Sequence, residues 1–363
     1  MIKKLKVKNY KSLRDVEIEL DKFTVLIGPN ASGKSNILDA LMFLSDIAKL
    51  PLDQVITQRG GFEHIVFGGE GQSFDLSVDL IIDNQPHDYD LRIENKIVNT
   101  EQLKVDGTTV LNRNPVGVCD VLRHDNSVNR MGFTQNETAL YYLNQDTYIH
   151  SSIRNVLIYF KSWKLYQISA SDMRRPIQAK RNFNLEKNGA NIAQVLISLR
   201  NERPKLFDRI QDILKQGIPE VDELLTPLTT DGNTYIAIRE KSFTKEFDYY
   251  QLSDGTIKLL AYITAVILPE SNVICFEEPE NFIHPRLLQL LVEVLKKSEK
   301  QVILSTHSPY FIDFVEPEDI RLVEKVKGET KVSKISDPEK LKEALKEIEL
   351  GELWYSGQFG GTR

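Results

Sequence analysis

Residues 28–35 read Gly28-Pro29-Asn30-Ala31-Ser32-Gly33-Lys34-Ser35 and fit the pattern G-x-x-x-x-G-K-[ST] without a gap. An apolar run at 23–27 precedes them and predicts a strand, whereas apolar residues at helical spacing over 37–48 predict a helix after them. Glycine lets the backbone turn its N–H groups inward, and a helix N-terminus adds the positive end of its dipole. We therefore interpret this stretch as the phosphate-binding loop of an α/β fold, with an ordinary glycine-rich turn as the alternative.

The side chains of this loop have expected roles in nucleotide binding. Lys34 is placed to reach the β- and γ-phosphates, and the Ser35 hydroxyl is placed to coordinate Mg²⁺. Lys34 is therefore counted with the catalytic residues, and Ser35 with the metal ligands. Asn36 follows directly and is counted with residues 28–35 as part of the nucleotide-binding set.

The charge, cysteine content and apolar runs of the sequence limit the kinds of protein it can be, but they do not identify a binding partner. The 363 residues carry a formal charge of −6, which excludes a wholesale basic surface, so any contact with DNA must come from a local patch. Cys119 and Cys275 lie far apart in the sequence, and Cys275 falls in an apolar run, as expected of buried thiols in a reducing compartment. The N-terminus resembles a strand rather than a signal segment, and no apolar run approaches 18 residues. A soluble, cytoplasmic protein without a membrane partner is expected.

Most of the first half shows strand periodicity. The run 112–144 is polar with poor periodicity, which predicts a surface excursion or insertion of undetermined fold. Apolar residues that alternate with charged ones predict half-buried strands at 2–13, 16–20, 74–82, 89–93 and 103–105, which together suggest an antiparallel β region.

Two further segments separate this region from the second half. Residues 153–181 mix basic and aromatic side chains, a mixture that suits either a nucleic-acid contact or a solvated face over a core. Residues 191–216 show helical periodicity on both sides of Pro204 and predict a two-helix insertion.

The run 272–278 is a short apolar strand that ends in two adjacent carboxylates, Glu277 and Glu278. In a chain with a phosphate loop, such a strand delivers acids to the carboxyl edge of a parallel sheet, where ligands of α/β proteins bind. Glu277 is expected on the Mg²⁺ side, through water because it is longer than the more usual Asp, and Glu278 is expected to polarise the attacking water. Two solvated carboxylates at a strand end are the alternative.

Two more motifs accompany the acidic strand. An apolar strand at 301–305 is followed by His307, which is placed to hydrogen-bond a γ-phosphate oxygen or the attacking water, unless it is only structural. Ser253-Asp254-Gly255 opens a helix that ends at Pro269, so Ser253 is either a second phosphate clamp or a plain N-cap.

The order phosphate loop, Ser-x-Gly helix, acidic strand and strand-His resembles that of the ABC-type ATPase heads of SMC and RecF-like recombination proteins. A narrower resemblance is to the stand-alone predicted ATPases akin to the heads of OLD-family nucleases, and it leaves residues 85–150 poorly matched. The motifs that carry it are Val7-Lys8-Asn9-Tyr10-Lys11-Ser12-Leu13, Leu252-Ser253-Asp254-Gly255-Thr256, Glu277-Glu278-Pro279-Glu280-Asn281-Phe282-Ile283-His284-Pro285, Ser305-Thr306-His307-Ser308-Pro309 and Leu350-Gly351-Glu352-Leu353.

The resemblance implies a P-loop NTPase fold with a mixed central sheet, an antiparallel β subdomain and a helical insertion. It implies one ATPase head over residues 1–363. The parts of that head are an N-terminal lobe at 1–110, an insertion with a helical lid at 111–217, and a C-terminal lobe at 218–363.

The resemblance also implies that ATP is hydrolysed only by a pair of chains. Ser253 and Gly255 of one copy are then expected to close over the γ-phosphate held by the other copy, with His284 near the same interface. Lys11 falls where related heads have an arginine that reaches the nucleotide. Gln58 is the candidate for the glutamine that contacts Mg²⁺.

The function implied is an ATP-dependent homodimeric switch that controls DNA or a DNA-related or anti-phage partner such as a nuclease. A transporter's ATP-hydrolysing subunit and a single-chain OLD-type nuclease are the alternatives. The segment after His307 argues against a single-chain nuclease, because it predicts only a strand pair at 320–326 and 331–335 and a helix from about Asp337-Pro338. We consider this too little for an added nuclease domain.

Overall fold

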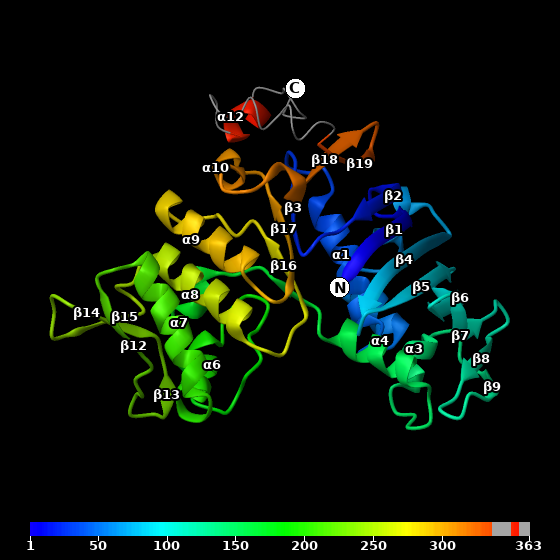
Figure 1. Ribbon diagram of the computed structural model, residues 1–363, viewed down its shortest axis with the longest axis horizontal. Coiled ribbons are helices and arrows are strands. Elements are labelled where there is room, and N and C mark those ends of the chain that lie inside the picture. Colours follow the sequence, from blue (N-terminus) through cyan, green and yellow to red (C-terminus); the bar gives the residue numbers. More distant parts are fainter. Residues whose placement is uncertain (336–349, 356–363) are drawn as a thin grey trace. The chain divides into compact units, whose positions relative to one another are not determined.

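The computed structural model describes residues 1–335 and 350–355, and the chain divides into two compact units. We call residues 1–163 with 318–335 the loop unit, because they contain the phosphate loop. We call residues 164–317 with 350–355 the signature unit, because they contain the motif Leu252-Ser253-Asp254-Gly255-Thr256, which we call the signature. Both units combine helices with sheets, which confirms the predicted α/β class (Figure 1). The three-part division of a single head at residues 110 and 217 stays a prediction.

The loop unit is built around a long antiparallel sheet of strand order β2-β1-β4-β5-β6-β7-β8-β9. Its elements are β1 (Ile2–Tyr10), β2 (Leu13–Glu19), β3 (Phe23–Ile27), α1 (Lys34–Asp46), α2 (Leu52–Gln58), β4 (Ser73–Ile82), β5 (Gln85–Glu94), β6 (Ile97–Val105), β7 (Thr108–Arg113), β8 (Val118–Leu122), β9 (Val128–Gly132), α3 (Ala139–Leu143), α4 (Ser151–Lys161), β18 (Ile320–Val326) and β19 (Glu329–Lys334).

The predicted strand periodicity decides which face of this sheet is buried. In β4 every second residue is buried, and Val7 of β1 lies opposite both Val16 of β2 and Leu76 of β4. The rings of Tyr10, Phe43 and Phe74 then join the sheet to α1, with each pair edge-to-face at 5.3–5.9 Å. Each such pair contributes roughly 0.5–1.5 kcal/mol beyond its buried area. The helix after the phosphate loop is therefore anchored on the sheet.

The polar run 112–144 does not leave the sheet as an excursion. It supplies β8, β9 and the helix α3, and the buried carboxylate of Glu101 in β6 accepts hydrogen bonds from the backbone N–H groups of Ala139 (2.5 Å) and Leu140 (3.0 Å). The expected excursion was wrong because β9 is short and mostly exposed, so its sequence has no reason to alternate.

The signature unit contains a three-stranded parallel arrangement, β10-β16-β17, and the helices α7, α8 and α9, which contact one another. Its elements are β10 (Lys164–Tyr166), α5 (Ala170–Met173), β11 (Ile177–Gln178), α6 (Ile192–Glu202), α7 (Pro204–Gly217), β12 (Val221–Leu225), β13 (Asn233–Thr234), β14 (Ala237–Glu240), β15 (Glu246–Asp248), α8 (Asp254–Ile267), β16 (Val273–Glu277), α9 (Pro285–Lys296), β17 (Gln301–Thr306), α10 (Pro309–Ile312) and α12 (Leu350–Tyr355).

Two predictions about the middle of the chain can be compared with these elements. The two helices expected at 191–216 are present as α6 and α7, which meet at Pro204, and their role as a lid stays a prediction. In the basic and aromatic segment 153–181, Trp163 is 1% exposed and Tyr166 is 3% exposed. These two rings are core residues, so the alternative of a solvated face over a core holds for them.

Other expectations concern the cysteines, the C-terminal segment and the membrane. Cys119 and Cys275 are free, buried thiols, as predicted. The strand pair expected near the C-terminus is present as β18 and β19, whereas the helix expected from about Asp337-Pro338 lies outside the described residues. Across 1–335 and 350–355, no helix combines the length and the apolar character needed to cross a membrane.

Candidate functional site

The phosphate loop joins the buried strand β3 to α1 through a left-handed turn. Gly33, the N-cap of α1, has φ 109°, a conformation that favours glycine, and it offers no side chain to cap the helix. Lys34 is 6% exposed, and its ammonium donates to the carbonyl oxygens of Gly28 (2.7 Å) and Pro29 (3.0 Å). The loop thus folds around the lysine side chain.

The β18–β19 hairpin braces this loop from the far end of the sequence. Thr330 of β19 is fully buried and donates its hydroxyl to the carbonyl oxygen of Ser32 (2.8 Å). The Thr330 Oγ1 atom also lies 2.7 Å from Ser12 Oγ. A Cβ at Gly33 would lie 2.1 Å from Thr330 Oγ1, and one at Gly28 would lie 1.9 Å from the carbonyl oxygen of Val323. Both glycines are therefore required by close approach of the hairpin. Thr330 was missed in the sequence because a single hydroxyl in a strand carries no motif.

The remaining loop residues are available to a ligand. Asn30, Ala31 and Ser35 are exposed, and the amide of Asn36 donates to Ser12 Oγ at 2.7 Å. One ammonium, two exposed polar side chains and an uncapped helix N-terminus form a donor set suited to a polyphosphate. The residues present therefore fit the predicted nucleotide.

Lys11 lies beside the loop in an ionic cluster with Asp39, Arg59 and Tyr10. Asp39 accepts from Tyr10 (2.6 Å), Lys11 (2.6 Å) and Arg59 (3.0 Å). Burial alone raises the pKa of Asp39, but Arg59 and Lys11 offset it, so that the net pKa lies below the usual aspartate value. Gln58 lies just before Arg59, at the exposed end of α2.

In the signature unit, candidate side chains lie at the carboxyl ends of three neighbouring parallel strands: Gln167 after β10, Glu277 and Glu278 at the end of β16, and His307 after β17. Tyr166 of β10 pairs with Phe276 of β16, and Glu277 of β16 pairs with Ser305 of β17. The amide Nε2 of Gln167, one residue past β10, donates to the carboxylate of Glu277. Sequence reasoning missed Gln167 because β10 has only three residues, too few for a periodic signal.

Glu278 is held in place by its backbone and by two side chains. Its backbone has φ 45°, uncommon for a residue with a side chain, and its N–H donates to the carbonyl oxygen of Ser305 (2.9 Å). One carboxylate oxygen lies 3.0 Å from Nδ1 of His307, and the other accepts from the amide of Asn281 (3.0 Å). The structure thus brings together two of the three residues predicted to be catalytic.

A second carboxylate lies under this pair. Glu280 is 7% exposed, its Oε1 accepts from the hydroxyl of Thr306 (2.5 Å), and it lies 4.0 Å from His307 Nδ1. Burial raises the pKa of Glu280 above the usual glutamate value, and the bond from Thr306 opposes this shift without cancelling it. Two carboxylates facing Nδ1 favour a proton on that nitrogen, which leaves Nε2 for other contacts.

The Ser-x-Gly motif starts α8 and packs on the loop that follows the acidic strand. Ser253 is the N-cap: its Oγ accepts from the N–H of Thr256 (3.1 Å), as the plain-cap alternative requires. A Cβ at Gly255 would lie 3.0 Å from the carbonyl oxygen of Phe282, so only glycine fits without displacement. Lys258, one turn on, donates to the carbonyl oxygen of Asn281 (3.0 Å), and burial lowers its pKa.

His284 is the N-cap of α9, and its Nδ1 accepts from the N–H of Arg286 (3.3 Å). It is exposed, as are Ser253 and Phe282, whose ring is 78% exposed. Within the described ranges, no three His, Cys, Asp or Glu side chains are grouped as a metal site. Mg²⁺ in nucleotide sites needs no such group, because it takes one or two protein oxygens together with phosphate oxygens and water.

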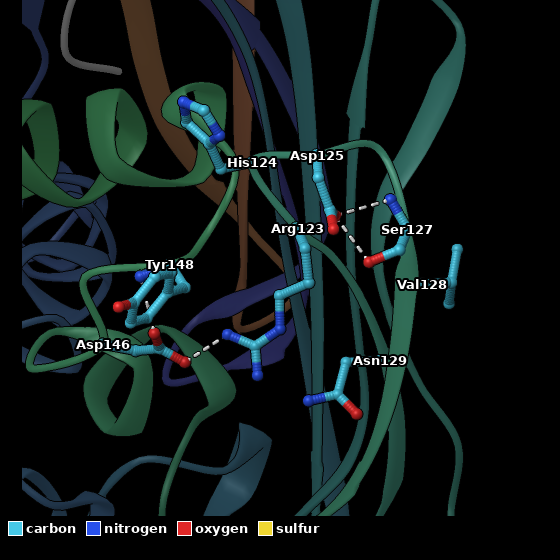
Figure 2. Close-up of a pocket in the computed structure, with 8 residues that line it drawn as sticks. All are labelled: Arg123, His124, Asp125, Ser127, Val128, Asn129, Asp146 and Tyr148. Carbon is cyan, nitrogen blue, oxygen red and sulfur yellow. Dashed lines mark hydrogen bonds and ion pairs between the residues drawn. The ribbon is translucent and has the colours of Figure 1, made fainter.

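A separate hollow of about 700 Å³ lies in the loop unit at the β8–β9 hairpin, the end of the sheet order opposite to β1 and β2 (Figure 2). Figure 2 shows the guanidinium of Arg123 pointing toward the carboxylate of Asp146, to which it donates. None of the residues predicted from the sequence lines it. The lining residues are Arg123, His124, Asp125, Ser127, Val128, Asn129, Asp146 and Tyr148.

Known proteins resemble the chain at the level of family and of fold. An OLD nuclease of Thermus scotoductus is 25% identical over 359 residues, which cover 90% of this chain and 62% of the nuclease, so the chain spans less than two thirds of that relative. An ATP/GTP phosphatase of Helicobacter pylori is 19% identical over 340 residues, with 87% of this chain and 88% of that protein covered.

Solved structures share the fold. An SMC head bound to the C-winged helix domain of ScpA superposes with a TM-score of 0.60 at 16% identity, covering 95% of this chain and 99% of that one. The SMC head domain of Thermotoga maritima gives a TM-score of 0.53 at 16% identity, covering 92% and 99%. A family model described as "AAA domain, putative AbiEii toxin, Type IV TA system" matches residues 23–313. Because that match spans most of the sequence, the chain belongs to this AAA-domain family; it shares its fold with SMC heads and is similar in sequence to an OLD nuclease.

Proposed function

We propose that the chain works as an ATP-driven dimeric switch. Two copies close on ATP and Mg²⁺, with the phosphate loop of one copy facing Ser253 and Gly255 of the other. The closed and open states then control a DNA-related partner. In this proposal residues 1–363 act as one ATPase head.

The observation that carries the proposal is the exposed face around the start of α8. Ser253, Phe282 and His284 are all exposed, although Gly255 between them is buried against the Phe282 carbonyl. Burial of the Phe282 ring against another surface would remove its apolar area from water. A second copy with bound nucleotide would supply a phosphate for the exposed Ser253 hydroxyl and a surface against Phe282.

Each copy supplies most of the groups for its own nucleotide. Lys34 and the α1 amides would hold the phosphates, and Ser35 and Glu277 would hold Mg²⁺, which when bound would supply charge neutralisation at the transferring phosphoryl group. Glu278 accepts a proton from the attacking water or orients it, and His307, fixed through Nδ1, offers Nε2 to the γ-phosphate. Lys11 reaches the nucleotide by leaving Asp39.

In this proposal Gln167 serves the Mg²⁺ site by orienting Glu277, in place of the direct Mg²⁺ contact expected of Gln58. Gln167 already donates to the Glu277 carboxylate, whereas Gln58 lies at an exposed helix end. Gln167→Ala should therefore raise the Mg²⁺ concentration needed for half-maximal turnover more than Gln58→Ala does.

The partner is proposed as a nuclease or DNA. One relative is an OLD nuclease, and the chain spans 62% of it. In this proposal the nuclease activity therefore belongs to a separate partner. A transporter subunit and a single-chain nuclease remain the alternatives. DNA cleavage by the purified chain with Mg²⁺ or Mn²⁺ would support the single-chain nuclease.

The first experiment uses Glu278→Gln, which removes the group that polarises water and keeps the groups that bind ATP. Turnover should fall by about 10²–10⁴-fold, the usual contribution of general acid–base catalysis. The mass in solution should double with ATP and Mg²⁺, measured by light scattering, and stay unchanged with ADP. An ATP-independent mass together with wild-type turnover would contradict the role of Glu278 and the switch.

A mixing experiment tests shared sites directly. Lys34→Ala and Ser253→Arg chains should each be inactive, whereas their mixture contains dimers with one intact site and should recover turnover. No recovery would mean that Ser253 does not serve a second copy.

A further inference from the structure

The guanidinium of Arg174 forms hydrogen bonds with several residues of the turn 249–254, which leads into α8. Its Nη2 donates to the Leu252 carbonyl oxygen (2.5 Å) and to the Asp254 carboxylate (2.6 Å), and Nε donates to the same carboxylate (3.1 Å). Its Nη1 donates to the carbonyl oxygens of Tyr249 and of Tyr250, the latter at 3.3 Å. Arg174 comes from a segment some 75 to 80 residues earlier in the chain.

These contacts flank Ser253 on both sides. Leu252 precedes it and Asp254 follows it, so the guanidinium fixes the backbone before the N-cap and the first side chain of the helix. The carbonyl groups involved lie outside helices and strands, where nothing in regular secondary structure satisfies them. Hydrogen bonds from a charged donor are roughly twice as strong as neutral ones.

The arginine itself is held in place. Met173, the residue before it, is 2% exposed and ends α5, which contacts α8. The side chain of Arg174 is 22% exposed and that of Asp254 is 47% exposed, so the pair is accessible but not freely solvated. A planar fork of five donors suits this convergence of acceptors, and a lysine ammonium cannot reproduce it.

We infer that Arg174 is a positioning residue for the signature: it holds the turn Leu252–Asp254 so that Ser253 faces the nucleotide of a second copy. The inference rests on the proposed dimeric switch and deepens it. Arg174 acts on its own copy's signature, and therefore on the other copy's ATP.

The test uses Arg174→Ala in the full-length chain. ATP affinity, measured with a fluorescent ATP analogue, should stay within about twofold, because the phosphate loop is untouched. Turnover should fall about 10–100-fold, the scale expected when one positioned group is misplaced. Arg175→Ala removes the neighbouring exposed cation and is the matched control, with turnover near that of the wild type.

Mixing assigns the defect to one half of the shared site. Arg174→Ala with Lys34→Ala should recover turnover, since one site of each mixed dimer is intact. Arg174→Ala with Ser253→Arg should not, because both defects lie in the signature. A chain that merely misfolds recovers in neither mixture, and thermal unfolding identifies that case.

Two further variants keep the test decisive if Arg174→Ala unfolds. Asp254→Asn removes one charged acceptor and should show a smaller defect with the same mixing pattern, and Arg174→Lys should recover only part of the activity. Wild-type turnover in Arg174→Ala, or recovery with Ser253→Arg, would overturn the inference. If Lys34→Ala with Ser253→Arg stays inactive, the shared site itself is wrong and the inference falls with it.

Discussion

Among the described residues, two helix starts carry the motifs predicted to contact phosphate, at α1 and at α8, and they satisfy the first helical turn in opposite ways. At α1 the N-cap is Gly33, which has no capping side chain, so the first amides are left for a ligand. At α8 the N-cap is Ser253, whose hydroxyl already accepts from Thr256 N–H. The first turn is built as an anion site, and the second is a finished helix start with an exposed serine.

Burial follows the same division. Lys34 and Ser32 are buried at 6% and 1% exposure, and Thr330 donates to the Ser32 carbonyl oxygen. Ser253 is exposed, and Arg174 holds its neighbours Leu252 and Asp254. In the proposed switch, the preorganised cradle binds ligand in one chain, whereas the exposed serine contacts the phosphate of a second copy. The comparison therefore predicts that the two helix starts differ in their dependence on a second copy.

Among the changes that compare these two helix starts, the largest expected effect comes from Ser253→Asp, which separates a capping serine from one that contacts phosphate. Asp is as good an N-cap as Ser, so α8 and the thermal unfolding midpoint should be unchanged. A carboxylate facing a γ-phosphate repels it, so turnover should fall by roughly 100-fold or more, while ATP binding by the unmixed chain persists. Wild-type turnover would reduce Ser253 to a plain cap, and Lys34→Ala, which loses ATP binding, is the contrasting control.

The fold was predictable where the sequence repeats a local physical rule. The alternation of apolar and polar residues predicted the strands at 74–82 and 89–93. Apolar residues at helical spacing on both sides of Pro204 predicted α6 and α7. The phosphate loop, acidic strand and strand-His were recognised for the same reason, because each motif is contiguous. Family and fold followed from their order.

What could not be predicted depends on partners distant in sequence or on very short elements. Thr330 contacts Ser12 across 318 positions, and nothing near either residue specifies the other. Gln167 and Arg174 act through single side chains at the ends of elements three and four residues long. The buried state of Trp163 depends on tertiary packing, which local composition does not encode.

A smaller effect is expected from Thr330→Val, which keeps the shape of a buried residue and removes its hydroxyl. The Ser32 carbonyl then loses a donor, and the brace on the phosphate loop weakens by about 1 kcal/mol, the usual net value of one hydrogen bond. ATP affinity should drop roughly fivefold, as 1 kcal/mol implies. Thr330→Ser should restore it, and the matched change Thr264→Val, which removes a buried hydroxyl bonded within α8, should leave ATP affinity unchanged. Equal losses for both would mean that Thr330 only stabilises the fold.

The smallest expected effects are on the free energy of unfolding, and they compare a buried carboxylate in each unit, Asp39 and Glu280. The pKa of Asp39, beside the phosphate loop, is lowered, whereas the pKa of Glu280, in the signature unit, is raised. A lowered pKa contributes stability above the unfolded value of about 4, which is lost as pH falls. A raised pKa contributes stability below about 4.3, which is lost as pH rises through the folded value.

The two neutral variants should therefore respond to pH with opposite sign. Asp39→Asn should lower the free energy of unfolding by about 1 kcal/mol at pH 7, with the loss shrinking toward pH 3 as Asp39 protonates in the wild type. Glu280→Gln keeps an oxygen for Thr306 and cannot ionise, so its stability relative to wild type should rise as pH increases from about 4.3 through the raised folded pKa of Glu280. Urea unfolding at fixed pH values measures both. Parallel curves for the two variants would show that burial, and not the paired cations around Asp39, decides how each carboxylate is held.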